Sequence, residues 1–251
     1  SESPYDYFGA GPSSTSISAA LGFAVARDLG HENAVVCAVI GDGSLTGGIA
    51  FEALNHAGQL GKRLVVVLND NEMSINRNVG ALSLYLTRLR SDPNYFRLKE
   101  DIEFLLKRIP AIGTQVARTA ERVKDAVRYM LIPGTLFEEL GFTYYGPLNG
   151  HDLTALRGVL QHARKIDGPV LIHVLTKKGK GYLPAEKSPD KYHGVGPFEV
   201  STGQPKNEGG ITYTAVFGET MVKLGAKNPE VVAVCAAMSA GTGLTQFAHR
   251  Y

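Results

Sequence analysis

The 251-residue sequence has no tryptophan, only two cysteines and no uninterrupted apolar run of membrane-spanning length. Two cysteines cannot form the several crosslinks of a small secreted domain, so we expect no disulfide framework and a reducing, cytoplasmic compartment. The sequence opens with Ser1-Glu2-Ser3-Pro4, which lacks the basic and apolar pattern of a signal peptide, and we expect a soluble protein. Because Cys37 and Cys235 both lie in apolar runs, we expect both thiols to be buried.

An excess of charge of either sign is also lacking. The sequence holds 26 Lys and Arg residues against 24 Asp and Glu residues, which gives a net charge of +2. This balance provides no electrostatic reason to expect nucleic acid or an anionic membrane as a partner. With 44% hydrophobic residues, a chain of this length can bury a substantial core, and we expect a folded protein.

Two short apolar runs predict buried β-strands. Residues 34–40 (Ala-Val-Val-Cys-Ala-Val-Ile) and 64–68 (Leu-Val-Val-Val-Leu) carry no polar side chain, as expected for strands covered on both faces. Apolar side chains between them recur at helical spacing, namely Ile49, Ala53, Leu54, Ala57 and Leu60. A strand, a helix and a second strand of this length form a crossover with parallel strands. The predicted fold class is α/β, a mostly parallel sheet with helices on both faces.

A polar residue follows each of these two strands. Asp42 lies in Gly41-Asp42-Gly43, and Asn71 follows 29 residues later in Asn69-Asp70-Asn71-Glu72. The carboxyl ends of parallel strands share one edge, where open α/β sheets bind ligands. A carboxylate and an amide oxygen, without a nearby Cys or His pair, suit Mg²⁺, which also binds phosphate. The sequence therefore predicts a metal site that serves a phosphorylated cofactor.

The residues after the first strand fit a diphosphate. Gly43, Gly47 and Gly48 allow a ligand to approach the backbone closely. Ser44 and Thr46 offer hydroxyl groups at the amino end of a helix, where anions are favoured. A Gly-Asp-Gly tripeptide alone is most often only a tight turn. The correctly spaced asparagine and the two strands favour a binding site over a turn.

Four stretches resemble one enzyme family. They are residues 13–20 (Ser-Ser-Thr-Ser-Ile-Ser-Ala-Ala), 51–58 (Phe-Glu-Ala-Leu-Asn-His-Ala-Gly), 68–75 (Leu-Asn-Asp-Asn-Glu-Met-Ser-Ile) and 145–152 (Tyr-Gly-Pro-Leu-Asn-Gly-His-Asp). The Gly41-Asp42-Gly43 followed about thirty residues later by Asn71 also resembles the signature of thiamin-diphosphate enzymes. With the four stretches, essentially the whole chain resembles the 1-deoxy-D-xylulose-5-phosphate synthases, which are transketolase-like transferases.

This resemblance implies a reaction and its cofactors. The cofactors would be thiamin diphosphate and Mg²⁺, and the substrates would be pyruvate and D-glyceraldehyde 3-phosphate. The products would be 1-deoxy-D-xylulose 5-phosphate and CO2, at the first step of the methylerythritol phosphate isoprenoid pathway, which also feeds thiamin and pyridoxal biosynthesis. The family further implies a homodimer.

The resemblance also implies roles for single residues. The Mg²⁺ ligands would be Asp42, Asn71 and the carbonyl group of Met73. The cofactor-binding residues would be Gly11, Ser13, Gly43, Ser44, Asn71, Ile75, Lys178 and Tyr182. An ammonium group such as that of Lys178 is strongly favoured beside a diphosphate. His193 would be catalytic and would handle the substrate, although without the resemblance it is simply a loop histidine.

One position departs from the family pattern. The family has Gly-His-Ser where this sequence has Gly11-Pro12-Ser13, and proline removes an imidazole and a backbone donor. Ile17, Leu21 and Val25 recur at four-residue steps after a start rich in Ser and Thr, which predicts a capped helix over residues 13–27. Because proline suits a first helical turn, we expect cofactor binding to persist, with slower turnover.

Strand patterns disappear between residues 78 and 130 and resume afterwards. The intervening segment has charged helical patterns, such as residues 95–108 and 114–128, and we interpret its basic side chains as a solvated helical face. We then expect a strand at 142–145, a helix at 152–165 and a strand at 169–175. His151 and His173 have no second ligand at a metal-binding spacing, so we interpret both as structural.

The predicted domains indicate an incomplete chain. Residues 1–200 would form a diphosphate-binding domain without its amino-terminal part, residues 201–210 a linker, and residues 211–251 the start of a pyrimidine-binding domain. That start would contain a helix at 213–224 and a strand at 231–236. The family's cofactor-activating glutamate would lie beyond Tyr251, so we expect the isolated fragment to be inactive.

Two alternative functions remain at this point. Another thiamin enzyme, such as a transketolase or the decarboxylating subunit of a 2-oxoacid dehydrogenase, would share Asp42 and Asn71. A cofactor-binding domain without activity would be compatible with Pro12. A substrate assay would identify another thiamin enzyme, and a glutamate on an adjoining segment would argue against the inactive domain.

Overall fold

The computed structural model describes residues 3–11, 13–73, 78–91, 135–206, 210–236 and 238–251. The chain divides into two compact units. The sheet unit comprises Ser1–Asp70 and Val79–Leu175, and the tail unit comprises Asn71–Asn78 and Thr176–Tyr251. The domain boundaries expected near residues 200 and 211 stay a prediction.

In its described part, the sheet unit is built on four strands. They are β1 (Cys37–Gly41), β2 (Leu64–Asp70), β3 (Thr143–Asn149) and β4 (Pro169–Leu175). The strand order is β1-β2-β4-β3, and every neighbouring pair is parallel. The predicted α/β class and parallel sheet are therefore confirmed. β1 begins three residues later than expected, and the carbonyl group of Ala34 instead accepts a hydrogen bond from Arg27.

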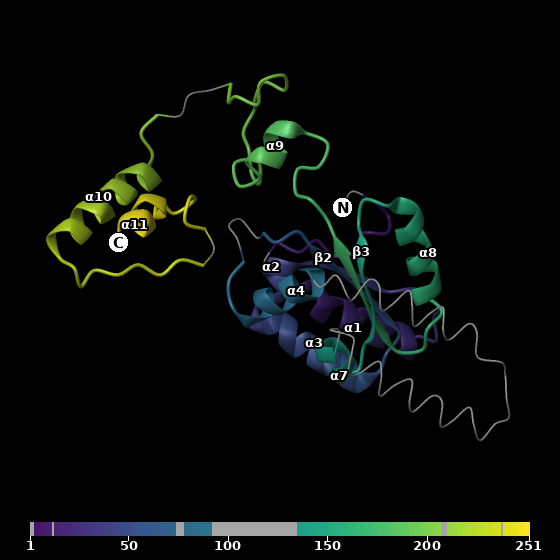
Figure 1. Ribbon diagram of the computed structural model, residues 1–251. Coiled ribbons are helices and arrows are strands. Elements are labelled where there is room, and N and C mark those ends of the chain that lie inside the picture. Colours follow the sequence, from purple (N-terminus) through teal and green to yellow (C-terminus); the bar gives the residue numbers. More distant parts are fainter. Residues whose placement is uncertain (1–2, 12, 74–77, 92–134, 207–209, 237) are drawn as a thin grey trace. The chain divides into compact units, whose positions relative to one another are not determined.

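Helices cover both faces of this sheet (Figure 1). One face packs against α1 (Ser16–Leu29), α3 (Gly48–Leu60), α4 (Ala81–Ser91) and α7 (Thr135–Glu139). The other face packs against α8 (Leu153–Ala163). Alternate residues of each strand point to opposite faces, so Leu171 joins the first core whereas Val170 and Ile172 join the second. The apolar strand sequences are explained by this double coverage.

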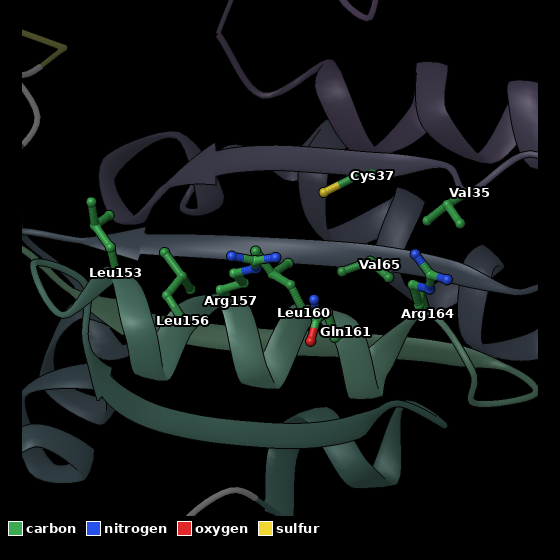
Figure 2. Close-up of a pocket in the computed structure, with 9 residues that line it drawn as sticks. All are labelled: Val35, Cys37, Val65, Leu153, Leu156, Arg157, Leu160, Gln161 and Arg164. Atoms are coloured by element: carbon green, nitrogen blue, oxygen red, sulfur yellow. The ribbon is translucent and has the colours of Figure 1, made fainter.

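The coverage by α8 stops short of β1 and leaves a groove. The groove has a volume of about 470 Å³ and is lined by β1, β2 and α8, as Figure 2 shows. Cys37 lines it and is exposed, and Cys235 is exposed as well, so the prediction of two buried thiols was wrong. Both are free thiols. Partial desolvation by its apolar neighbours raises the pKa of the Cys37 thiol.

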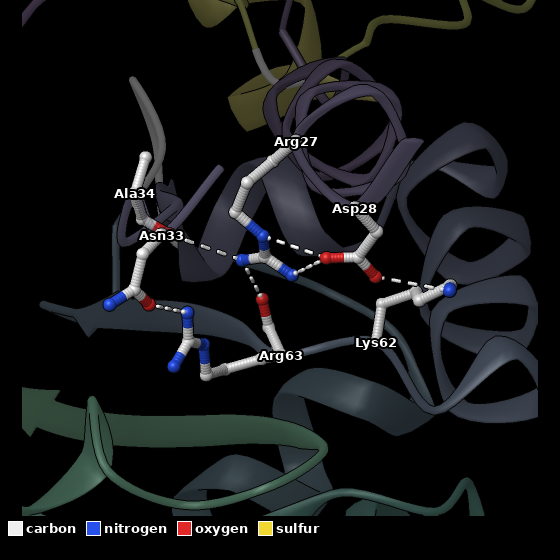
Figure 3. A network of polar contacts seen from close by, with 6 residues as sticks. All are labelled: Arg27, Asp28, Asn33, Ala34, Lys62 and Arg63. Carbon is white, nitrogen blue, oxygen red and sulfur yellow. Dashed lines mark hydrogen bonds and ion pairs between the residues drawn. The ribbon is translucent and has the colours of Figure 1, made fainter. Parts of the chain in front are cut away.

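A polar network ties together the chain at the amino ends of β1 and β2 (Figure 3). The buried guanidinium of Arg27 donates to Asp28 and to the backbone carbonyl of Arg63, at 2.6 and 2.8 Å. Lys62 Nζ lies 3.0 Å from the same carboxylate. The bonds from Arg27 and Lys62 hold the pKa of Asp28 below its usual value. This network lies at the opposite end of the strands from Asp42.

The helices predicted from the described part of the sequence are present, but some begin or end at other residues than expected. α3 and α8 confirm the helices expected at 49–60 and 152–165, and Asp152 caps α8 by accepting from the backbone N–H groups of Thr154 and Ala155. α1 begins at Ser16, and Thr15 makes no side-chain cap, because its backbone is already helical. Of the helical segment expected at 78–130, only α4 lies within the described residues. The helices expected at 95–108 and 114–128 lie outside them.

The tail unit contains three helices in its described part, α9 (Leu183–Lys187), α10 (Tyr213–Lys227) and α11 (Thr245–Arg250). α10 confirms the helix expected at 213–224. The strand expected at 231–236 was wrong, since Val232 and Val234 are exposed and the described residues offer no strand beside them to pair with. Within the described ranges, no helix has the length and apolarity needed to cross a bilayer.

Candidate functional site

The register of β1 and β2 defines one edge of the sheet. Gly41 pairs with Asn69, so Asp42 and Asp70 each follow this pair at the carboxyl ends of neighbouring strands. Asp42 begins the short helix α2 (Asp42–Leu45), and only 2% of its surface is exposed. Asn71 is the next residue after Asp70 along the chain. The parallel geometry that the sequence predicted for this edge is therefore present.

The structure brings together two segments that the sequence assigned to the cofactor. The hydroxyl of Ser14 donates to the carbonyl of Ser44 at 2.7 Å, which joins the segment of Gly11 and Ser13 to the segment that follows Asp42. A Cβ atom at Gly47 would overlap the Ser14 hydroxyl, so this close approach requires glycine. The segment of Gly11 and Ser13 therefore lies against α2 and the glycine turn that follows it.

The residues that the sequence analysis assigned to the cofactor differ in how far they are exposed. Gly11 and Ser13 are exposed, whereas Gly43 and Ser44 are half-buried. The hydroxyl of Thr46 donates to the Gly43 carbonyl at 2.7 Å, so it closes a local turn. Pro12 and Ile75 lie outside the described residues.

Asn71 and Met73 lie in the tail unit, where they form a tight turn. The backbone N–H of Met73 donates to Asn71 Oδ1 at 3.1 Å, and Glu72 between them has a positive φ of 67°. An amide oxygen has two lone pairs, so this bond leaves one for a cation. The turn holds the side-chain oxygen and the Met73 backbone close to each other.

A carboxylate organises the basic loop after β4. Glu186 of α9 accepts from the Gly181 backbone N–H at 2.9 Å and pairs with Lys177. The hydrogen bonds from Lys177 and Gly181 lower the pKa of Glu186. These contacts close the loop that carries Lys178 and Tyr182.

Lys178 and His193 are in direct contact, at 3.1 Å between Nζ and Nδ1. An ammonium group can only donate, so Nδ1 accepts and Nε2 carries the ring proton. His193 is exposed, and its Nε2–H can serve as a donor to a ligand. The family resemblance implied a role for each residue, but it did not predict their contact.

Tyr182 belongs to an aromatic cluster with Tyr192 and Phe198. Its ring centroid lies 5.7 Å from that of Tyr192 and 6.0 Å from that of Phe198. Its hydroxyl donates to the Val200 carbonyl at 2.8 Å, and partial desolvation raises the pKa of the phenol. Because Tyr192 precedes His193, the cluster links the two sequence-assigned residues Tyr182 and His193.

The sequence analysis missed a buried polar group near the carboxyl end of β2. His173 is fully buried and contacts Asp70 and Tyr144. Arg90 also binds Asp70, so its interpretation as part of a solvated face was wrong. The sequence contains a hint of this group. Residues alternate between the two faces of a strand, and Asp70 and His173 fall on the faces of β2 and β4 whose other residues pack in the core.

The metal-binding chemistry of the described chain rests on oxygen donors. Among the described residues, no group of three or more His, Cys, Asp or Glu side chains is arranged to hold a metal ion. A site of one carboxylate, one amide oxygen and one backbone carbonyl would not form such a group, and these hard donors suit Mg²⁺. His151 is exposed, and its backbone N–H donates to Asn149 Oδ1 in a turn.

Comparisons with known proteins identify the family of the chain. The family model described as 1-deoxy-D-xylulose-5-phosphate synthase matches residues 1–176. The chain is 64% identical over 252 aligned positions to the 1-deoxy-D-xylulose-5-phosphate synthase of Pelotomaculum thermopropionicum, covering 100% of this chain and 39% of that protein. The synthase of Natranaerobius thermophilus is 61% identical, with 100% and 40% covered.

A solved structure of a thiamin diphosphate-dependent enzyme from Mycobacterium smegmatis matches with a TM-score of 0.37 and 19% identity, over 66% of this chain and 22% of that chain. At that score the likeness carries no argument. The chain spans about two fifths of the length of the curated relatives that it matches. The family model, which covers well over half of the chain, together with these identities, establishes that the chain belongs to the 1-deoxy-D-xylulose-5-phosphate synthase family.

Proposed function

We propose that this chain supplies the magnesium- and diphosphate-binding part of an enzyme that condenses pyruvate with D-glyceraldehyde 3-phosphate to 1-deoxy-D-xylulose 5-phosphate and CO2. The observation that carries the proposal is the aligned ending of β1 and β2, which brings Asp42 to the strand end that Asn71 directly follows. Family membership with 64% identity to a synthase of that name supports the same reaction.

The residues of this chain fit the proposed cofactor. Asp42, Asn71 and the Met73 carbonyl offer hard oxygen donors for Mg²⁺. The Ser14–Ser44 contact and the required Gly47 form a small-residue surface next to Asp42, as close backbone approach to a diphosphate demands. Gly43 and Ser44 would contact that diphosphate, with Gly11, Ser13 and Ile75 as further cofactor-binding residues.

Thiamin diphosphate, when bound, supplies the carbanion chemistry that decarboxylation requires. The chain itself contributes orientation and charge. The Lys178 ammonium has three donors, so it can neutralise a phosphate oxygen while it still binds His193. His193 would present its Nε2–H to a substrate oxygen. Tyr182, at the end of the same loop, would contact the cofactor.

We further propose a cytoplasmic enzyme that works as a homodimer, which the family suggests. Magnesium is the proposed metal because the donors are oxygens. The substrates bear phosphate or carboxylate groups, which fits a site with a lysine and a polarised histidine.

Substitution of the proposed metal ligand tests the function. In a full-length protein that contains this chain, Asp42→Ala should abolish magnesium-dependent binding of thiamin diphosphate, because it removes the carboxylate of the cation site. Isothermal titration calorimetry measures the affinity, and a coupled assay measures formation of 1-deoxy-D-xylulose 5-phosphate.

Asp28→Asn is a matched control, since it removes a carboxylate charge at the opposite end of the strands. It should leave cofactor affinity within about twofold of wild type. Normal cofactor affinity in Asp42→Ala would refute the metal assignment, and binding without any product from the wild-type protein would refute the proposed reaction.

A further inference from the structure

Four side chains from four elements form a continuous buried network, the Asp70 network. Arg90 Nη1 lies 2.8 Å from Asp70 Oδ1, and His173 Nε2 lies 2.9 Å from Asp70 Oδ2. The hydroxyl of Tyr144 lies 2.8 Å from His173 Nδ1. Asp70, His173 and Tyr144 are at most 5% exposed, and the Arg90 side chain is 18% exposed. The network joins β2, β4, β3 and α4.

The donors and acceptors of the network fit in one arrangement. Asp70 is a carboxylate that accepts from Arg90 on one oxygen and from His173 Nε2–H on the other. His173 Nδ1 then accepts from the Tyr144 hydroxyl. Both oxygens of Asp70 are held, so its carboxylate plane and the end of β2 have a defined orientation.

Stability alone is a weak explanation for this network. Asp70 occupies the face of β2 on which Leu64, Val66 and Leu68 are buried in the apolar core. Removing charges from water is costly, and apolar residues in place of a buried ion pair often give equal or greater stability. A buried pair at this position is better explained by what it orients.

The location of the network indicates what it orients. Asp70 is the last residue of β2, and Asn71 follows it by one peptide bond. Arg90 lies in α4, the first helix after the segment that begins with Asn71. The Asp70–Arg90 ion pair therefore ties the start of this segment to the helix that follows it.

We infer that Asp70 is a positioning residue for the metal site: held by Arg90 and His173, it fixes the direction in which Asn71 leaves the sheet and thereby sets Mg²⁺ affinity. The inference rests on the proposed function, because it takes Asn71 as a ligand. Groups that orient a metal ligand typically account for a 10- to 100-fold range in metal affinity.

The test uses Asp70→Asn in the full-length protein. Magnesium affinity is measured by calorimetry with thiamin diphosphate present, and activity is measured as a function of magnesium concentration. We expect about 10-fold weaker magnesium binding. We also expect a turnover number near that of wild type at saturating magnesium, because the ligands themselves are unchanged. A purely structural role would lower the melting temperature and leave the magnesium affinity of the folded protein unchanged.

Tyr144→Phe provides a second variant that keeps the ring and removes only the far hydroxyl of the network. It should weaken magnesium binding by about two- to fivefold, less than Asp70→Asn, because it acts through His173. Should Asp70→Asn not fold, this variant decides, and unchanged magnesium affinity in it would overturn the inference. Asp28→Asn, in the network of Figure 3, is the control for loss of a carboxylate next to a buried arginine.

The two proposals fail in different ways. If the wild-type protein binds no magnesium with thiamin diphosphate, the proposed function is wrong. If wild type binds, Asp42→Ala does not, and Asp70→Asn binds as wild type does, then only the positioning role is wrong.

Discussion

At the scale of single residues, the contact between Lys178 and His193 bears most directly on the proposed chemistry. It selects one tautomer of a neutral imidazole, since only Nδ1 can accept from the ammonium. The ring nitrogen that remains a donor is Nε2, which belongs to an exposed side chain. Lys178, which the resemblance assigned to the diphosphate, thus sets the proton position on His193, which the resemblance assigned to catalysis.

The first prediction at this scale concerns that tautomer. Lys178→Met keeps the length of the side chain and removes the donor, so the neutral ring of His193 should shift from mostly Nε2–H towards a mixture of tautomers. Nitrogen-15 chemical shifts of labelled histidine report the ratio without any cofactor.

Lys180→Met is the matched control, because Lys180 is an exposed lysine of the same loop. It should leave the His193 shifts unchanged. An identical nitrogen spectrum in Lys178→Met and wild type would show that the contact does not set the proton position.

At the scale of elements, the loop between β4 and α9 is closed by one carboxylate. Glu186 has a lowered pKa because it accepts from Lys177 and from the Gly181 N–H. A carboxyl group with a lowered pKa in the folded state stabilises the fold at pH values above its ordinary pKa, here 4.5. This contribution is lost as the pH falls through the lowered pKa.

We therefore expect the loop to open only in acid. As the pH falls from 4.5 through the lowered pKa of Glu186, Gly181 should lose protection of its amide proton, whereas Glu186→Gln should show weak protection and no such pH dependence over the same range. Amide hydrogen exchange followed by NMR measures both. Glu199→Gln, at an exposed carboxylate in the same unit, is the control. Full protection of Gly181 at a pH where Glu186 is shown to be protonated would contradict the role of Glu186.

The elements also show how far the sequence could lead. The two apolar runs and the helical spacing between them suffice to predict β1, α3 and β2, because local periodicity determines them. The Asp70–His173 contact could not be placed in this way, since its partners are 103 residues apart and meet only through the pairing of β2 with β4. The strand expected at 231–236 failed because a strand depends on a neighbour that local sequence does not reveal.

In the candidate site, too, the features that depend on local sequence could be predicted and the others could not. Asp42 and its edge follow from the strand ends and the crossover rule, which act locally. The exposure of Cys37 could not be predicted, because an apolar strand sequence does not say how far a helix such as α8 extends over it. The roles of Lys178, Tyr182 and His193 came from resemblance, and their binding roles stay predictions.

At the scale of the whole molecule, the order of the strands in space differs from their order in the chain. Of the four described strands, β4 comes last in sequence, yet it lies between β2 and β3 and pairs with both. Without β4, β2 and β3 each lose a partner and expose an unpaired edge.

This order predicts the effect of truncation. A chain that ends at Gly168 should show no cooperative thermal transition and should aggregate, whereas a chain that ends at Gly210 keeps all four strands and should retain a cooperative transition of the sheet unit. Circular dichroism on heating and light scattering measure the two outcomes. A cooperative, monodisperse chain ending at Gly168 would contradict the central role of β4.

The position of β4 also has a consequence for the protein while it is being made. Ribosomes add roughly 5–20 residues per second, so β2 leaves the ribosome on the order of five to twenty seconds before the strand that must lie beside it. During that interval the nascent chain exposes one of its most apolar strands, and a holding chaperone has a defined target in residues 64–68 until Pro169–Leu175 emerges.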